Sequence, residues 1–547
     1  MLDTSSPGNT NLEQRRIQER EQQQREQRER SVDVRLPSPA GAAAERLPDG
    51  ETPCFPIRQI ELRGQEAGRF GWLIDAVSGP QQTDSPLRKC LGAQGVGLVI
   101  RRAQDALVER GYITSRVLAQ PQDLNNGHLS LTVLPGRIRA IRFEEPVSDR
   151  ATAWNAFPAS AGDILNLRDI EQALENFQRV PTAEADIQIV PADVPGQSDL
   201  LVRWRQGTPF RVHVGADDSG TQGTGKYQGN LTLSYDHWWT LNDLFYLSLQ
   251  HDLGGGASGA RGTRGATAHY SIPMGYWMLG MTASSSRYFQ TVAGASQDYV
   301  YRGSNRNQEV SLSRLVHRDA SSKTTLRLKA FARQSNNFID DTEVEVQRRR
   351  VGGWELGVTH RAFVGPATID AGLAYKRGTG AFGALPAPEE AFGEGSSRFA
   401  LVSADIGLQW PLSIAGRRWQ YNGQWRAQFN RTPLTPQDRF AIGGRYTVRG
   451  FDGASSLSAE RGWLLRNELL TAVGPDGMFW FVALDTGQVG GPSAGSLLGR
   501  RLSGAVLGLR GSAGRVQYEL FAGAPLKKPE GFRTAHVSYG FQLNAGF

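Results

Sequence analysis

Few side chains in this sequence could carry covalent or metal chemistry. The only cysteines are Cys54 and Cys90, 36 positions apart. This pair, with no histidines clustered near it, matches no zinc site. In a cytosolic protein the pair would have no single interpretation, whereas in an oxidising compartment it indicates one disulfide. Closing that loop would stabilise the fold by roughly 3–4 kcal/mol in the chain-entropy model.

Two glycine-containing segments resemble catalytic motifs only in part. Gly220, Gly225 and Lys226 have phosphate-loop spacing, but Tyr227 replaces the required Ser or Thr and a strand is expected to follow. The G-x-S-x-G pattern at 491–495 lies among Pro and Gly, which favours a hairpin loop over a nucleophile elbow. The eight histidines show no metal-binding spacing. We therefore expect that the protein is not an enzyme and that it has no catalytic residue, no cofactor and no bound metal.

The composition favours a membrane β-barrel. Apolar residues make up 39% of the chain, and no run approaches the roughly 18 apolar residues that a membrane helix needs. Barrel strands expose only alternate side chains to lipid, so a chain with 64 glycines and scattered aromatic residues is compatible with them. The net charge of +7 is dispersed, which argues against nucleic-acid binding. The N-terminus has no secretory leader, so we expect a mature form with an added Met.

Two soluble α/β units are expected before the barrel, after a polar N-terminal segment. Nearly all of residues 12–30 are Glu, Gln or Arg, so 1–30 is either a solvated charged arm or a polar helix inside a water-filled pore. Nineteen helical residues span about 29 Å, close to the thickness of a bilayer core. Residues 31–52 contain prolines and an Ala/Gly cluster and predict an extended linker.

The two α/β units repeat one plan. In residues 53–140 the pattern predicts a strand near Ile60, a helix over 95–110 and strands at 112–119 and 128–134. In residues 141–207, Asn166 is a predicted helix cap, followed by strands at 186–190 and 199–204. Two units of similar design in tandem indicate an internal repeat.

Residues 208–547 change to an alternating pattern. Leu326 and Leu328 alternate with Arg327 and Lys329, as expected of a wall with a lipid face and a polar lumen. The longest alternation ends at the terminal Phe547, the typical last strand of an outer-membrane barrel. At roughly 20 residues per strand and turn, this segment accommodates about 16 antiparallel strands.

Three segments, in this order, resemble the two-partner secretion transporters (TpsB), the haemolysin- and haemagglutinin-exporting branch of the Omp85 superfamily. Residues 106–138 resemble the first POTRA domain of that branch, and 165–202 resemble the second. Residues 445–451, RYTVRGF, match the VRGY/F motif of its sixth extracellular loop. The resemblance covers nearly the whole chain.

The resemblance implies a 16-stranded barrel whose sixth loop, around 440–460, folds back into the lumen. The motif residues here are Val448, Arg449, Gly450 and Phe451, and Arg449 is expected to pair with Asp485 of FVALDTG on the inner wall. A planar guanidinium can bond a carboxylate at two points and hold a loop tip in place. From the residues alone, a hairpin arginine in lumen water is the less favoured alternative for Arg449.

The resemblance also implies a function. The N-terminal helix would plug the barrel, and the POTRA pair in the periplasm would bind a large secreted partner, a haemolysin, an adhesin or a contact-dependent inhibition toxin, in unfolded form. The protein is expected to be a monomer in outer-membrane lipid that exports this partner without nucleotide hydrolysis. The alternative is a barrel assembly factor of the same superfamily, but such proteins usually carry more POTRA domains and no plug helix. A passive porin would not need POTRA-like units.

Overall fold

Sixteen antiparallel strands form one closed barrel in the computed structural model of the chain. Each strand pairs with the next along the sequence, and β27 closes the sheet on β9. The model describes residues 16–22, 24–25, 28–29, 32–36, 45–79, 82–294, 296–474 and 477–547. The barrel strands are β9 (Phe210–Asp217), β10 (Tyr227–Asp236), β11 (Leu244–Gly254), β12 (Arg261–Met274), β13 (Trp277–Ala293), β14 (Asp298–Arg318), β15 (Ser322–Ile339), β17 (Arg349–Val364), β18 (Ala367–Thr379), β19 (Ala400–Ile414), β20 (Arg417–Asn430), β23 (Arg461–Val473), β24 (Met478–Gly490), β25 (Arg501–Ala513), β26 (Val516–Lys527) and β27 (Ser538–Gly546).

The alternation of the sequence separates the two faces of the wall. On β15 the side chains of Leu326 and Leu328 are exposed on the outer face. On the inner face of the same strand, Lys329 pairs with Glu355 at 3.0 Å and Arg333 pairs with Asp438 at 2.6 Å. Successive side chains of a strand point to opposite faces, so the period-2 pattern is sufficient to assign them.

The C-terminal residue takes part in closing the barrel. The backbone N of Phe547 donates to the carbonyl of Val212 at 2.9 Å, and the N of Val212 donates back at 3.0 Å. The closing pair joins Gln542–Gly546 of β27 to His213–Asp217 of β9, which satisfies backbone groups that would be costly to leave unpaired in the membrane.

The first α/β unit contains a three-stranded sheet in the order β2–β5–β4, with β2 parallel to β5. Its elements are β1 (Phe55–Pro56), β2 (Gln59–Arg63), η1 (Ala67–Phe70), α2 (Leu73–Ala76), β3 (Cys90–Leu91), α3 (Ala93–Glu109), β4 (Arg116–Leu118) and β5 (His128–Leu134). The strand predicted at 112–119 is shorter than expected. Its first residues form a turn, because Tyr112 folds against Phe70 with ring centroids 5.2 Å apart.

The second unit has the same topology. It consists of β6 (Arg137–Phe143), α4 (Leu167–Gln178), β7 (Ala183–Pro191) and β8 (Gln197–Gln206), with sheet order β6–β8–β7 and β6 parallel to β8. Asn166 caps α4 by accepting a hydrogen bond from the backbone N of Arg168 at 2.8 Å. The repeated plan in the sequence therefore corresponds to a repeated fold.

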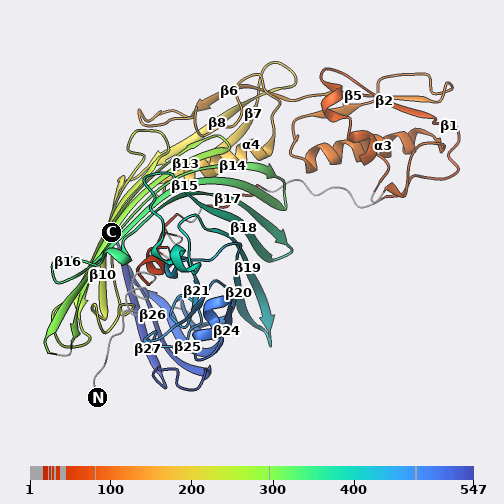
Figure 1. Cartoon of the computed structure of the whole chain (residues 1–547). Helices are drawn as coiled ribbons and strands as arrows, with labels where there is room; N and C mark the ends of the chain where they lie inside the picture. Colours follow the sequence, from red (N-terminus) through yellow and green to blue (C-terminus); the bar gives the residue numbers. More distant parts are fainter. Residues whose placement is uncertain are drawn as a thin grey trace.

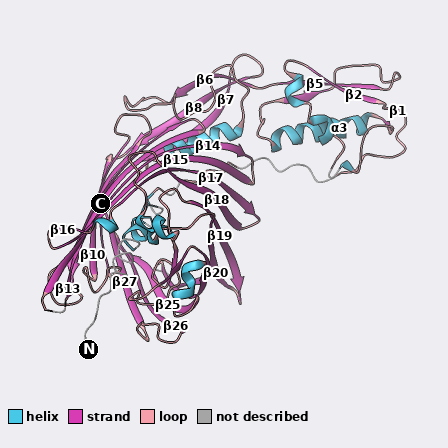
Figure 2. Cartoon of the chain, in the orientation of Figure 1, coloured by secondary structure: helices cyan, strands magenta, loops and turns pink. Residues whose placement is uncertain are grey.

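Both units lie beyond one end of the barrel, with the second next to the strand ends and the first farther out (Figure 1). Asn155 of the second unit reaches the end of β12, where its side chain donates to the carbonyl of Pro273 at 3.1 Å. Helical segments also lie inside the ring of strands (Figure 2). No helix in the described part of the chain has the length and apolar character to cross a membrane.

Candidate functional site

The loop between β20 and β23, residues 431–460, packs against the inner wall and is called loop 6 below. It contains η5 (Pro436–Asp438) and a short pair of strands, β21 (Phe440–Ile442) and β22 (Leu457–Ala459). Val448 and Phe451 are buried in an apolar cluster with residues of the wall. The ring of Phe451 meets that of Phe532 edge to face, with centroids 5.8 Å apart. The apolar residues of the VRGF motif thus hold the loop tip by packing.

Arg449, between these two residues, faces a buried carboxylate. Its Nε lies 2.7 Å from Oδ2 of Asp485 and its Nη2 lies 3.0 Å from Oδ1. The backbone N of Arg449 also donates to Oδ2, at 3.0 Å. The contact is a two-point guanidinium–carboxylate pair with a third bond from the main chain, which fixes the loop as well as the side chain.

A second carboxylate completes the environment of Arg449. Its Nη1 donates to Oε2 of Glu468 on β23 at 2.7 Å. Arg510 on β25 pairs with the same Glu468 at 3.0 Å, and Arg466 lies 3.8 Å from Asp485. Arg510 also pairs with Glu519 on β26 at 3.2 Å, so three arginines and three carboxylates form one network that joins loop 6 to β23, β24, β25 and β26. Removing one member would leave a buried charge uncompensated.

Glycines let the loop backbone approach this wall. A Cβ on Gly504 would lie 2.0 Å from the carbonyl oxygen of Arg449, and one on Gly523 would lie 2.9 Å from Cα of Gly450. Gly450 itself has a φ of +94°, in the left-handed region. The close contact thus requires glycine on both sides.

The described residues of the predicted N-terminal segment are helical at 16–22, 24–25 and 28, and we call them the lumen helix. Arg25 pairs with Glu309 on β14 at 3.1 Å, and Gln24 accepts a bond from Gln250 on β11 at 3.0 Å. Its one apolar residue, Ile17, packs against two tyrosines of the wall. Figure 1 shows this helix, in red, within the ring of strands. Residues 1–15, 23, 26, 27 and 30, together with residues 31 and 37–44 of the predicted linker, lie outside the described residues.

The extended linker segment 32–36 lies between α4 and the barrel. The backbone N of Val34 donates to Glu175 at 3.0 Å, and that of Leu36 donates to Glu171 at 2.9 Å. From the barrel wall, Arg318, the last residue of β14, donates to the carbonyl of Val34 at 2.6 Å. The linker segment, the second α/β unit and the barrel therefore meet at one group of charged side chains.

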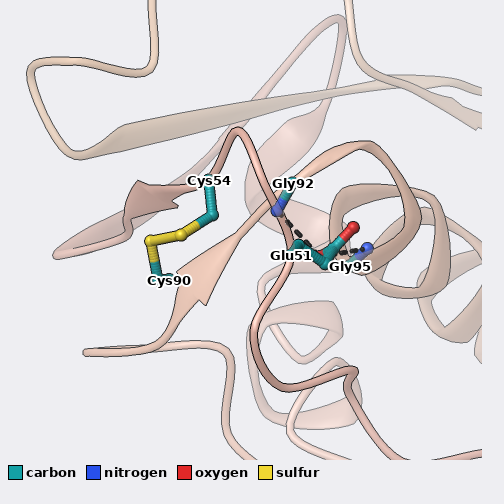
Figure 3. Close-up of a disulfide and its surroundings, with 5 residues drawn as sticks. All are labelled: Glu51, Cys54, Cys90, Gly92 and Gly95. Atoms are coloured by element: carbon teal, nitrogen blue, oxygen red, sulfur yellow. Dashed lines mark hydrogen bonds between the residues drawn. A yellow bond between two sulfur atoms is a disulfide. The ribbon is translucent and has the colours of Figure 1, made fainter.

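Cys54 and Cys90 are joined as a disulfide, with Cα atoms 5.2 Å apart (Figure 3). Beside it, the carboxylate of Glu51 accepts from the backbone N of Gly92 at 2.8 Å and of Gly95 at 3.0 Å, at the start of α3. A carboxylate at a helix N-terminus satisfies amides that have no partner within the helix. Two contacts thus tie residues 51–54 to the first unit.

The closed barrel and the two α/β units before it define a class of protein: a transmembrane barrel preceded by paired small α/β domains. Residues 55–136 match a ShlB-type POTRA domain model, and 137–191 match a POTRA domain model. Residues 196–511 match the model of the haemolysin secretion/activation proteins ShlB/FhaC/HecB. The chain belongs to this family, the two-partner secretion transporters of the Omp85 superfamily.

Relatives cover almost the whole chain. The outer membrane transporter CdiB-2 of Burkholderia pseudomallei is 37% identical, over 94% of this chain and 90% of that protein. The haemolysin transporter ShlB of Serratia marcescens is 25% identical over 86% of this chain and 79% of that protein. The solved structure of CdiB from Acinetobacter baumannii has a TM-score of 0.86 and 30% identity, covering 100% of both chains. The protein is therefore an outer-membrane transporter with periplasmic POTRA domains.

The sequence motifs predicted the pair of Arg449 and Asp485. They did not predict that Glu468, Arg466 and Arg510 join this pair. The alternation on β23 carries the missing signal, because Leu465 and Leu469 occupy the lipid-facing positions and so direct Arg466 and Glu468 inwards. The acidic residues of α4 that hold the linker segment were also missed. Glu171 and Glu175 are one helical turn apart, a spacing that is equally typical of a solvated helix face.

Proposed function

We propose that the transporter exports one large partner protein as an extended chain through its lumen, and that the lumen helix must leave first. A haemolysin, an adhesin or a contact-dependent inhibition toxin fits such a partner. The observation that carries the proposal is the set of bonds between the lumen helix and the wall. Arg25, Gln24 and Glu21 contact β14, β11 and β13, so the helix fills the path of a client.

The domain boundaries are part of the proposal. Residues 1–30 act as the plug, 31–52 as the linker, 53–136 and 137–207 as the POTRA domains, and 208–547 as the barrel. We place the boundary between the POTRA domains four residues before the one expected at 140, because β6 (Arg137–Phe143) pairs with β8 of the second sheet. The POTRA domains bind the unfolded client by adding its extended strand to a sheet edge, because backbone hydrogen bonds give affinity without a specific fold. The transporter acts as a monomer, without catalysis and without nucleotide.

The loop anchor formed by Arg449 and Asp485 keeps loop 6 against the wall while the helix moves. Its bidentate geometry and its burial support this role. The alternative, a barrel assembly factor, has no support among the named relatives, which are transporters.

A reversible crosslink tests whether the helix must leave. Oε1 of Gln24 and Nε2 of Gln250 are 3.0 Å apart at the ends of two long side chains, so a bis-methanethiosulfonate reagent of matching length should bridge the two cysteines of the Q24C/Q250C variant and hold the helix on β11. Secretion of the partner should stop after crosslinking and resume with reductant. The single variant Q24C and the unmodified protein, given the same reductant, control for the native Cys54–Cys90 disulfide. Normal secretion by the crosslinked protein would contradict the proposal.

A further inference from the structure

The outer wall carries a group of arginines at the end of the barrel away from the POTRA domains. Arg264 on β12 and Arg287 on β13 are direct cross-strand partners, and both are exposed. Arg306 on β14 pairs in register with Gln334 on β15, which in turn pairs with Arg350 on β17. The four arginines form two adjacent rows across five strands.

These arginines face the membrane side, not the lumen. The opposite face of β13 carries Tyr288, which packs against Ile17 of the lumen helix. Arg306 shares its face with the exposed Val310 and Leu312, which lie lower on the same strand. Arg287 is therefore on the same outer surface as the lipid-facing band.

The distance of these arginines from the periplasmic turns matches the thickness of the apolar part of the membrane. Arg287 lies ten positions beyond Trp277, which begins β13 at the periplasmic turn. At about 3.3 Å per residue and a strand tilt of about 40°, this corresponds to about 25 Å, the height of the apolar band of such barrels. The arginines thus lie at the level of the outer-leaflet headgroups.

The charge of this group is not neutralised by the protein. Like charges directly opposite each other on a sheet are destabilising, yet Arg264 and Arg287 have no ion pair with any residue that the structure describes. Four carboxylates near this rim are engaged elsewhere: Asp341 pairs with Arg302 at 2.9 Å, Glu343 pairs with Arg348 at 2.6 Å, and Asp252 and Asp340 accept backbone N–H groups of Thr263 and Val300. An external anion would supply the negative charge that these carboxylates do not give to Arg264 and Arg287.

An apolar recess of about 440 Å³ lies below the arginines on the same strands. Its outward-facing residues include a floor of small side chains with two larger ones beside it: Ala268, Ala283, Ala330, Ala332, Met281 and Val310. Ala283 is four positions from Arg287 and Ala268 is four positions from Arg264, about 13 Å along each strand. A ligand with a negatively charged head and a hydrocarbon chain would contact both the arginines and the apolar recess.

We propose that the outer face of β12–β17 is a binding site for a phosphorylated lipid of the outer leaflet. Arg264, Arg287, Arg306 and Arg350 bind the phosphate groups, and the alanine-lined recess holds an acyl chain. Guanidinium groups bind phosphate oxygens in a two-point geometry, and basic pockets on membrane proteins recognise lipid headgroups. In the outer membrane, lipid A of lipopolysaccharide has both phosphate groups and acyl chains.

Native mass spectrometry of the purified full-length protein tests the proposal, with lipid A, dephosphorylated lipid A and inorganic phosphate as separate probes. Lipid A should bind, and the R264Q/R287Q variant should bind it at least tenfold more weakly. The matched control is R461Q/R501Q, which removes two exposed arginines from the extracellular ends of β23 and β25. This control should stay within twofold of the unmodified protein.

The remaining outcomes separate the sources of phosphate. Equal binding of lipid A and its dephosphorylated form, or an unchanged R264Q/R287Q variant, would overturn the proposal. Substituting Ala283→Phe fills the recess and should weaken lipid A binding severalfold while leaving inorganic phosphate binding unchanged. An unaffected A283F variant whose lipid A is displaced by inorganic phosphate would show a phosphate site without lipid specificity. Heat-modifiable electrophoretic mobility confirms that each variant barrel is folded.

Discussion

At the scale of single residues, two buried carboxylates hold the guanidinium group of Arg449. Its guanidinium donates to Asp485 and Glu468, and its backbone N uses a further lone pair of Asp485. Such a network depends on the planar, forked shape of arginine, which an ammonium group does not reproduce. The neighbouring Arg466 and Arg510 place two further positive charges beside these carboxylates.

Substituting Arg449→Ala should abolish secretion while the barrel still inserts in the outer membrane. Breaking a buried pair by removing one partner costs about 3–5 kcal/mol, enough to release the tip of loop 6. Arg449→Lys should recover only part of the activity, because it cannot make the two-point contact. Secretion is measured by immunoblot of the medium, and insertion by heat-modifiable mobility.

The matched control for Arg449 is Arg461→Ala, which removes an exposed arginine at the start of β23. This variant should secrete normally. Wild-type secretion by Arg449→Ala would remove the loop anchor from the mechanism.

At the scale of elements, the first POTRA domain depends on a covalent crosslink near its edge. The Cys54–Cys90 disulfide joins β3 to the segment before β1, and its loop spans η1 and α2. The C54S/C90S variant should therefore lose roughly 3–4 kcal/mol of stability in this domain through loop-closure entropy. Hydrogen exchange of the full-length protein checks this, with faster exchange in α3 and unchanged exchange in α4. Unaltered protection of α3 would mean that the disulfide adds no stability.

The contact between the two POTRA domains should depend on pH. The hydrogen bond from Arg137 of β6, assisted by Arg69, holds the pKa of Glu66 below its ordinary value of 4.5. A carboxylate with a lowered folded-state pKa contributes stability above pH 4.5, and this contribution is lost as the pH falls through the lowered pKa. We expect the distance distribution between spin labels on the two domains to broaden in that acidic range.

The matched variant is Glu66→Gln, which cannot form the ion pair. Its distance distribution should already be broad at neutral pH and should change little on acidification. A narrow, pH-independent distribution in both proteins would show that the ion pair does not hold the domains.

At the scale of the whole molecule, the linker segment connects three parts. It is bonded to α4 and to the last residue of β14, and the chain before it continues to the lumen helix. Binding of a client to the second POTRA domain can thus affect the same group of contacts that positions the helix. This is a physical path between the periplasm and the lumen, formed by side chains in contact.

Deleting residues 1–30 should increase channel conductance severalfold in planar bilayers. The helix fills part of the lumen, so its removal widens the ion path. The matched control is the Q24C/Q250C protein crosslinked with the bis-methanethiosulfonate reagent, in which the helix stays in place and conductance should remain low. Equal conductance of the deletion variant and the intact protein would contradict the plug.

The sequence by itself determined the class of fold. Period-2 alternation assigned the faces of the barrel strands, and the repeated strand and helix pattern predicted two similar units, because both depend on local periodicity. Arg449 and Asp485 were identified because the segments that contain them resemble motifs of a known family. Cys54 and Cys90 were expected to pair because they are the only two cysteines of the sequence. The strand at 112–119 was predicted too long, since a ring contact between Tyr112 and Phe70 overrides local propensity.

Only the tertiary structure decided which residues lie opposite one another. Glu468 meets Arg449, Glu171 meets Leu36, and Arg264 meets Arg287, from positions far apart in the chain. Alternation gives the face on which a side chain lies, but strand register and loop path decide its neighbours. These depend on the closure of the whole barrel, a long-range property that no local stretch of sequence contains.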